Sequence, residues 1–296
     1  MSGPDKGYFP DGESVLREVH RERVVGLLYG QRALAIGALA PLNFIGTRRH
    51  SRHFDKPFQR LARTGKAFET IFFGTRAEAD RVLAMVERMH GRVEGELPEA
   101  AGPIPAGTAY SAFDPELMLW TVAVIADSAQ RFYELFVRRL SDHELDRLWA
   151  DYVRFGELFG MPRDEVPSSY AEFRHWWDRR LSSPDLHLTH EARYVGASIM
   201  FGIPVSTTRA PAMALHNLIM CGSLPPRVRG EYRLTWSPAH DVAFRGAVAT
   251  AKATRPLTPE SLLRGPNTRN FDQVADRERW MLARGKPVKG ALEQAA

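Results

Sequence analysis

Lysine and cysteine are scarce in this sequence, and each shortage narrows the range of functions. Of the 40 cationic residues only six are lysine, so arginine carries nearly all of the positive charge. Arginine favours planar, bidentate partners such as carboxylates and phosphates. The formal net charge of +5 is small for 296 residues, so we expect no nucleic acid partner. The single cysteine, Cys221, excludes a disulfide framework and a cysteine-rich metal cluster.

Long apolar runs are also missing. The most apolar early stretch, "VVGLLYGQRALAIGALAPLNFIG", is interrupted by Arg32 and by several glycines, and its unbroken part covers only residues 33–42. A membrane-spanning helix needs about 20 apolar residues, so we expect a buried helix here and no stable membrane span. The first residues, "MSGPDKGYFPDGES", are polar and contain no apolar signal-peptide core, which predicts a cytoplasmic protein.

Several signatures of catalysis and of sheet structure are absent as well. The sequence contains no glycine-rich phosphate loop, no G-x-S-x-G nucleophile elbow and no H-E-x-x-H metal motif. Alternating strand-like runs between turn signals are nearly absent. These absences argue against a nucleotide-binding fold, a serine hydrolase and a protein built on a β-sheet.

Helix start signals are frequent instead. Capping boxes begin at Thr75, Ser141 and Ser169, each followed three residues later by a glutamate. A capping residue directly before a proline recurs at positions 114, 237 and 258. These signals predict an all-α fold, a single multi-helix globular domain with about ten or more helices. We expect an N-terminal extension at 1–20, a helical domain at 21–284 and a loosely ordered tail at 285–296.

His90 lies on the apolar face of a predicted helix in "RVLAMVERMHGRVEG", residues 81–95. Two interpretations are open. A buried histidine is commonly a core residue that hydrogen-bonds a carbonyl, and a neutral imidazole on an apolar face is also a suitable ligand for a metal or a haem iron. His216, in the apolar stretch "PAMALHNLIMCG", competes for the ligand role. The pairs His50/His53 and His187/His190 lack a third ligand at a telling distance, so they do not predict zinc or di-iron.

The stretch "RRHSRHFDKPFQRLART", residues 48–64, is rich in cations and aromatics. Arg60 and Thr64 are four residues apart and Arg63 is three from Arg60, so a helix places them on one side. A solvated basic surface is one interpretation. The other is an arginine held among Phe54, Phe58 and Leu61 that orients an anionic group, such as a haem propionate, a bound oxygen species or an enolate-like intermediate.

Five stretches follow one another between about residues 21 and 236: "RRHSRHFDKPFQRLART", "FFGTRAEADRVLAMVERMHGRVEG", "YSAFDPELMLW", "LSDHELDRLWADYVRFGELFGMP" and "LPPRVRGEYRLTW". In this order they resemble the MpaB-type oxygenase family, which includes the catalytic domain of latex clearing protein (rubber oxygenase). The resemblance implies an all-α fold around one haem b. It implies that His90 is the proximal iron ligand, and that Arg60, Arg63 and Thr64 lie beside the haem, with Arg60 and Thr64 on its distal side.

Two departures from the rubber oxygenase pattern bear on the substrate. A lysine that caps the distal iron there corresponds to Arg63 here, and the pocket glutamate of that enzyme falls in "APLNFIG", residues 40–46, which holds no acid. We therefore expect a haem b-dependent oxygenase for an apolar, unsaturated small molecule rather than for polyisoprene. Molecular oxygen would bind at the iron held by His90, with Arg60 and Thr64 polarising it. The alternatives are a non-catalytic haem sensor or carrier and a cofactor-free helical ligand-binding protein.

Overall fold

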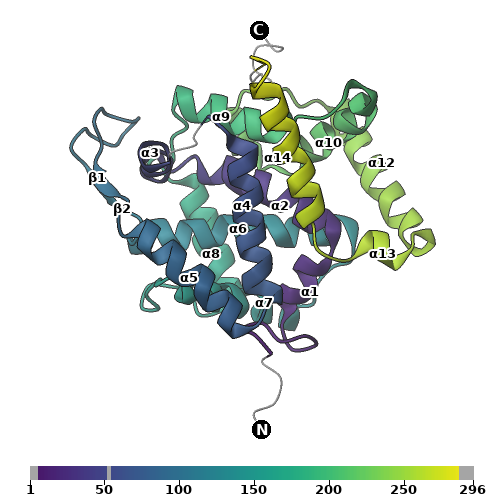
Figure 1. Cartoon of the computed structure of the whole chain (residues 1–296), viewed down its shortest axis with the longest axis horizontal. Helices are drawn as coiled ribbons and strands as arrows, with labels where there is room; N and C mark the ends of the chain where they lie inside the picture. Colours follow the sequence, from purple (N-terminus) through teal and green to yellow (C-terminus); the bar gives the residue numbers. More distant parts are fainter. Residues whose placement is uncertain (1–5, 52–54, 287–296) are drawn as a thin grey trace.

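The longest helix, α6 (Pro115–Phe136), lies at the centre of the fold and packs along α2 (Arg23–Gly37). In the computed structural model, which describes residues 6–51 and 55–286, most of α6 is buried (Figure 1). Trp120 of α6 is fully buried and stacks on Trp177. A helix that is apolar on nearly every side is typical of a protein interior, so α6 is the centre of the hydrophobic core.

The other helices surround this pair and confirm the predicted helical fold. The exception among the described residues is one antiparallel hairpin of β1 (Glu94–Glu96) and β2 (Ala109–Ser111), with short 3-10 turns at Thr207–Arg209 and Arg255–Leu257. The surrounding helices are α1 (Val15–Arg21), α3 (Pro41–His50), α4 (Pro57–Phe73), α5 (Arg76–His90), α7 (Asp142–Leu158), α8 (Tyr170–Ser182), α9 (His190–Phe201), α10 (Ala210–Ser223), α11 (Pro226–Glu231), α12 (Pro238–Thr254), α13 (Glu260–Leu263) and α14 (Thr268–Leu282).

Five of the six helix starts that the sequence predicts are confirmed. Thr75 and Ser141 form complete capping boxes, and the side chains of Asp114 and Ser237 also cap their helices. Ser169 caps its helix too, but its predicted box is incomplete, because the carboxylate of Glu172 accepts the backbone N–H of Ser168 instead. The prediction at Thr258 is wrong. Its hydroxyl donates to the carbonyl of Thr254 in the preceding turn, so it caps nothing, and α13 begins at Glu260 without a side-chain cap.

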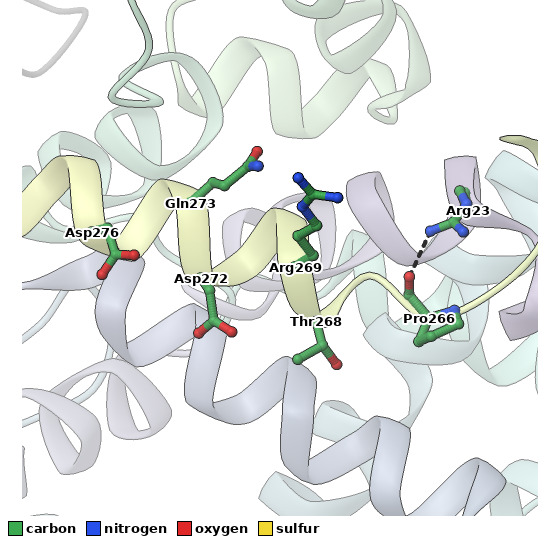
Figure 2. Close-up of a pocket in the computed structure, with 7 residues that line it drawn as sticks. All are labelled: Arg23, Pro266, Thr268, Arg269, Asp272, Gln273 and Asp276. Atoms are coloured by element: carbon green, nitrogen blue, oxygen red, sulfur yellow. Dashed lines mark hydrogen bonds between the residues drawn. The ribbon is translucent and has the colours of Figure 1, made fainter.

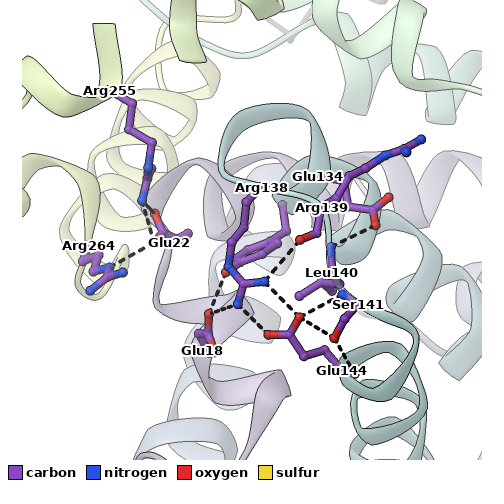
Figure 3. Close-up of polar contacts among 11 residues, drawn as sticks. Glu18, Glu22, Glu134, Arg138, Arg139, Leu140, Ser141, Glu144, Arg255 and Arg264 are labelled. Carbon is purple, nitrogen blue, oxygen red and sulfur yellow. Dashed lines mark hydrogen bonds and ion pairs between the residues drawn. The ribbon is translucent and has the colours of Figure 1, made fainter. Parts of the chain in front are cut away.

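Several buried charges are paired. Arg32 of α2 is 2% exposed and lies 2.7 Å from the carboxylate of Asp127 in α6. Glu22, at the junction of α1 and α2, is 1% exposed and pairs with Arg255 and Arg264 from the C-terminal part of the chain (Figure 3). A buried charge is tolerated when an opposite charge and hydrogen bonds replace its water shell.

No single helix among the described residues is long and apolar enough to cross a membrane. The apolar stretch after Arg23 is divided between α2 and α3. Only together do these two helices have the length and apolar composition of a membrane span, and the chain bends by 109° between them. Val25, Ala35 and Ile36 of α2 are fully buried in the protein core, which is the environment that the sequence predicts for this stretch.

A buried histidine in α1 makes stability depend on pH. His20 is 5% exposed, and its Nε2 lies 2.7 Å from the hydroxyl of Tyr152. Burial lowers the pKa of His20 to about 3. Because the unfolded chain binds a proton near the ordinary pKa of about 6.5 and the folded protein does not, the stability present above that pH is lost as the pH falls.

We expect the free energy of unfolding to fall by about 2 kcal/mol between pH 7 and pH 5 through this residue, at about 1.4 kcal/mol per pH unit below 6.5. Urea titrations at both pH values measure the loss. His20→Gln, whose amide can still reach Tyr152, removes this loss. His143→Gln, at an exposed position in α7, is the control and should show the same loss of unfolding free energy as the wild type. An equal loss in wild type and His20→Gln would contradict the assignment.

Candidate functional site

The helices α4 and α5 follow one another along the chain and are joined by Gly74 and Thr75. Gly74 is needed at this turn because a Cβ there would lie 2.6 Å from the carbonyl oxygen of Thr70. Thr75 then starts α5 with a complete capping box. The two helices diverge as they leave the turn (Figure 1). Arg60, in the first turn of α4, and His90, at the end of α5, both lie far from the turn, and no contact among the described residues joins their side chains.

His90 is the last residue of α5 and is half-buried, with its ring 6.2 Å from that of Phe113. Within the described residues its imidazole makes no hydrogen bond, whereas the rings of His20, His50 and His216 each have a partner. Burial lowers the pKa of His90 below its ordinary value. The imidazole is therefore mostly neutral near pH 7, and within the described part of the chain no hydrogen bond engages its nitrogen lone pair.

The rival histidine, His216, is fixed in the core. Its Nε2 lies 2.9 Å from the side-chain oxygen of Gln31, and its Nδ1 lies 3.2 Å from that of Asn217. Both of these atoms are amide oxygens, which accept, and a neutral imidazole has one N–H, so the ring donates to one of them, of which Gln31 is the nearer. His187 is half-buried without such a bond, but its ring packs directly over Gly102. His53 lies outside the described residues, and no group of three or more potential ligands was found among the residues that are described.

The three predicted residues of α4 share one side of that helix. Arg63 and Thr64 are exposed, whereas Arg60 is half-buried and its guanidinium donates to the hydroxyl of Ser51 over 3.4 Å. Burial lowers the pKa of the Arg60 guanidinium, which nevertheless stays charged at any accessible pH. The helical period places Phe58, which is 2% exposed, on roughly the opposite side. Phe54 lies outside the described residues, so its predicted place beside Arg60 is not described.

Apolar side chains on α5 remain open to solvent near His90. Met85 and Met89 are 54% and 56% exposed, and they flank the face that Val86 and His90 occupy. Val86 itself is only half-buried.

The larger of two pockets found among the described residues lies elsewhere. It has a volume of ≈640 Å³ and lies beside α14 near the start of α2 (Figure 2). Its lining is mostly charged or polar, so it does not suit an apolar molecule. A second cavity of ≈10 Å³, beside His20 and Tyr29, has room for one water at most. The lining of the larger cavity is Arg23, Pro266, Thr268, Arg269, Asp272, Gln273 and Asp276.

Comparison with known proteins gives one family and two relatives. The sequence model of the family described as "ER-bound oxygenase mpaB/B'/Rubber oxygenase, catalytic domain" matches residues 17–253. An uncharacterized protein of Mycobacterium tuberculosis and one of Mycobacterium bovis are each 24% identical over 206 residues, which is 70% of this chain and 78% of theirs. No solved structure matches the chain.

The protonation of His90 is directly measurable. An NMR titration of the ring protons should give a pKa below the ordinary value of about 6.5, because desolvation disfavours the imidazolium. Phe113→Ala uncovers the ring and should raise the pKa toward that value. His175, exposed in α8, serves as the internal reference, because its ring signals should be the same in the wild type and in Phe113→Ala. A His90 pKa at or above 6.5 in the wild type would show that the ring is solvated.

Proposed function

The chain belongs to the family of ER-bound oxygenase mpaB/B' and rubber oxygenase catalytic domains, and from this premise we propose that it is a haem b-dependent oxygenase. We further propose that its substrate is an apolar, unsaturated small molecule. The observation that carries the cofactor assignment is the imidazole of His90, which is neutral, half-buried and without a hydrogen-bond partner in the described part of the chain.

Three features of α4 and α5 suit a haem. A neutral imidazole is a suitable axial ligand for haem iron. The exposed side chains of Met85 and Met89 offer apolar surface to a porphyrin. Arg63 is exposed on the side of α4 that also carries Arg60, and an arginine suits the carboxylates of haem propionates. His90 would hold the iron, and the arginines would hold the propionates or face the reacting centre.

When bound, haem supplies the iron centre that activates dioxygen. The chain's own residues would orient and shield the reaction. Arg60, restrained by Ser51 and partly desolvated, would donate hydrogen bonds toward developing negative charge, where a fixed cation is most effective. The hydroxyl of Thr64, one turn further along α4, would donate beside it. The apolar flank of α5 would exclude water.

Two alternatives predict different observations. A haem protein that senses or carries a ligand would bind gases without consuming oxygen over a panel of unsaturated terpenes. A cofactor-free binding protein would be colourless when purified from iron-replete cells. The absorption spectrum and an oxygen electrode therefore separate the three functions.

We expect one haem per chain, bound through His90. His90→Ala should lose the Soret band while the far-ultraviolet circular dichroism stays that of a helical protein, because His90 is the last residue of its helix. His216→Ala is the matched control and should keep the band, because the ring of His216 is already held in the core by its contact with Gln31. Loss of the band in His216→Ala and not in His90→Ala would reverse the assignment.

Arg60 should contribute to turnover more than to folding. Removing a preorganised charge that stabilises a transition state costs about two to three decades in rate. We therefore expect Arg60→Ala to lower oxygen consumption by that factor with an unchanged melting temperature. Arg88→Ala, which removes an exposed arginine of α5, is the control. A variant that unfolds but keeps full specific activity in its folded fraction would make Arg60 a structural residue.

Position 63 should not ligate the iron. A guanidinium keeps its proton and offers only donors, whereas a desolvated lysine can lose a proton and present a lone pair. The ferric wild type should therefore be high-spin and bind cyanide readily, and Arg63→Lys should become six-coordinate and low-spin. Arg63→Gln, which also removes the charge, should stay high-spin. A low-spin ferric wild type without added ligand would contradict this arrangement.

A further inference from the structure

Beyond residue 253, where the family match ends, the chain continues into α13 and α14 and is anchored by buried or half-buried acids. Glu22 pairs with Arg255 at 2.8 Å and with Arg264 at 3.0 Å (Figure 3). Glu69 of α4 accepts hydrogen bonds from the backbone N–H of Asn267 and the hydroxyl of Thr268, at 2.6 and 2.7 Å. These contacts fix the start of α14 against the rest of the protein.

The helix α14 then runs closely along α4. The ring of Phe271 packs against Gly65, where an added Cβ would lie 2.6 Å from a ring carbon. Further along, Lys66 of α4 pairs with Asp272 at a partly exposed site. Ala62 and Gly65 are buried on roughly the opposite side of α4 from Arg60. The helix α14 therefore supports α4 from behind the residues assigned to the reaction.

The closest support is at the first turn of α4. Glu278 of α14 is 0% exposed, and its carboxylate accepts the backbone N–H of Phe58 at 3.1 Å and that of Gln59 at 2.8 Å. The first N–H groups of a helix have no partner within the helix, and the residue at the cap position, Lys56, provides no side-chain cap. A carboxylate here also interacts favourably with the helix dipole. Glu278 thus does what a local capping residue does elsewhere.

We propose that Glu278 is a positioning residue for Arg60, which follows Gln59 directly in this first turn. This inference rests on the proposed function, because it assigns Glu278 to the same site. If Glu278 is lost, the first turn of α4 loses the one side-chain cap that the described residues give it, and it frays. The backbone of Arg60 then moves, and its guanidinium no longer faces the reacting centre in one orientation. The catalytic family domain would accordingly need a residue outside the region that the family model covers.

The test compares Glu278→Ala and Glu278→Gln with wild type. Glutamine keeps the size and one acceptor, so it provides a folded variant if alanine does not. Asp272→Asn is the matched control, because it changes another α14 carboxylate that contacts α4 away from the first turn. Amide hydrogen exchange over residues 55–64 reports on the turn without any need for haem. The C–O stretch of the ferrous carbon monoxide complex reports on donors near the iron, with Arg60→Ala as the reference.

We expect exchange at the amides of Phe58 and Gln59 to be about five- to ten-fold faster in Glu278→Ala, the factor for a lost helix cap. The C–O stretch should shift toward that of Arg60→Ala, with a smaller shift in Glu278→Gln and none in Asp272→Asn. Faster exchange with an unchanged stretch would make Glu278 a structural cap only and overturn the proposal. An equal shift in Asp272→Asn would also overturn it. If the wild type binds no haem, the proposed function is wrong. If it binds haem but the Glu278 variants leave the C–O stretch unchanged, only the assignment of Glu278 is wrong.

Discussion

Asp127 joins three helices at the centre of the protein, and the arrangement around it depends on that charge being matched. One carboxylate oxygen of Asp127 lies 2.7 Å from Arg32 of α2, and the other lies 2.8 Å from Arg174 of α8. Removing one member of such a buried group typically costs about 3–5 kcal/mol, because the remaining charge stays in the interior without a partner. The outer helices pack on the framework that α2 and α6 form around this group. Among them is α4, which carries Arg60.

The parts of the fold that sequence could predict are those with local causes. Thr75 and Ser141 cap their helices with groups three residues away, so the pattern in the sequence contains the whole interaction. The same pattern gave a wrong prediction at Thr258, because its hydroxyl donates to a carbonyl in the preceding turn. The hairpin after α5 also escaped prediction, because its strands are three residues long and Glu94, Gly95 and Glu96 are all exposed. Such strands have no alternation of apolar and polar residues.

In the candidate site, too, features with a local cause could be predicted and contacts between distant residues could not. The position of His90 on an apolar helical face follows from a local period, and the structure places the ring half-buried near Phe113. The contact between His216 and Gln31 could not be predicted, because Gln31 is 185 residues away in the sequence. The cap from Glu278 on α4 has no local signature for the same reason. A lone glutamate in a charged helix near the end of the chain is indistinguishable, in sequence, from a solvated one.

The separation between Glu278 and its acceptor site has a consequence for synthesis. Phe58 precedes Glu278 by 220 residues, so the ribosome makes α4 long before the group that completes its first turn. Domains fold as their residues emerge, and contacts between distant residues form late. Until α14 has been made, the first turn of α4 is without the carboxylate of Glu278. A cofactor that needs the finished site would therefore bind only after α14 has packed against α4.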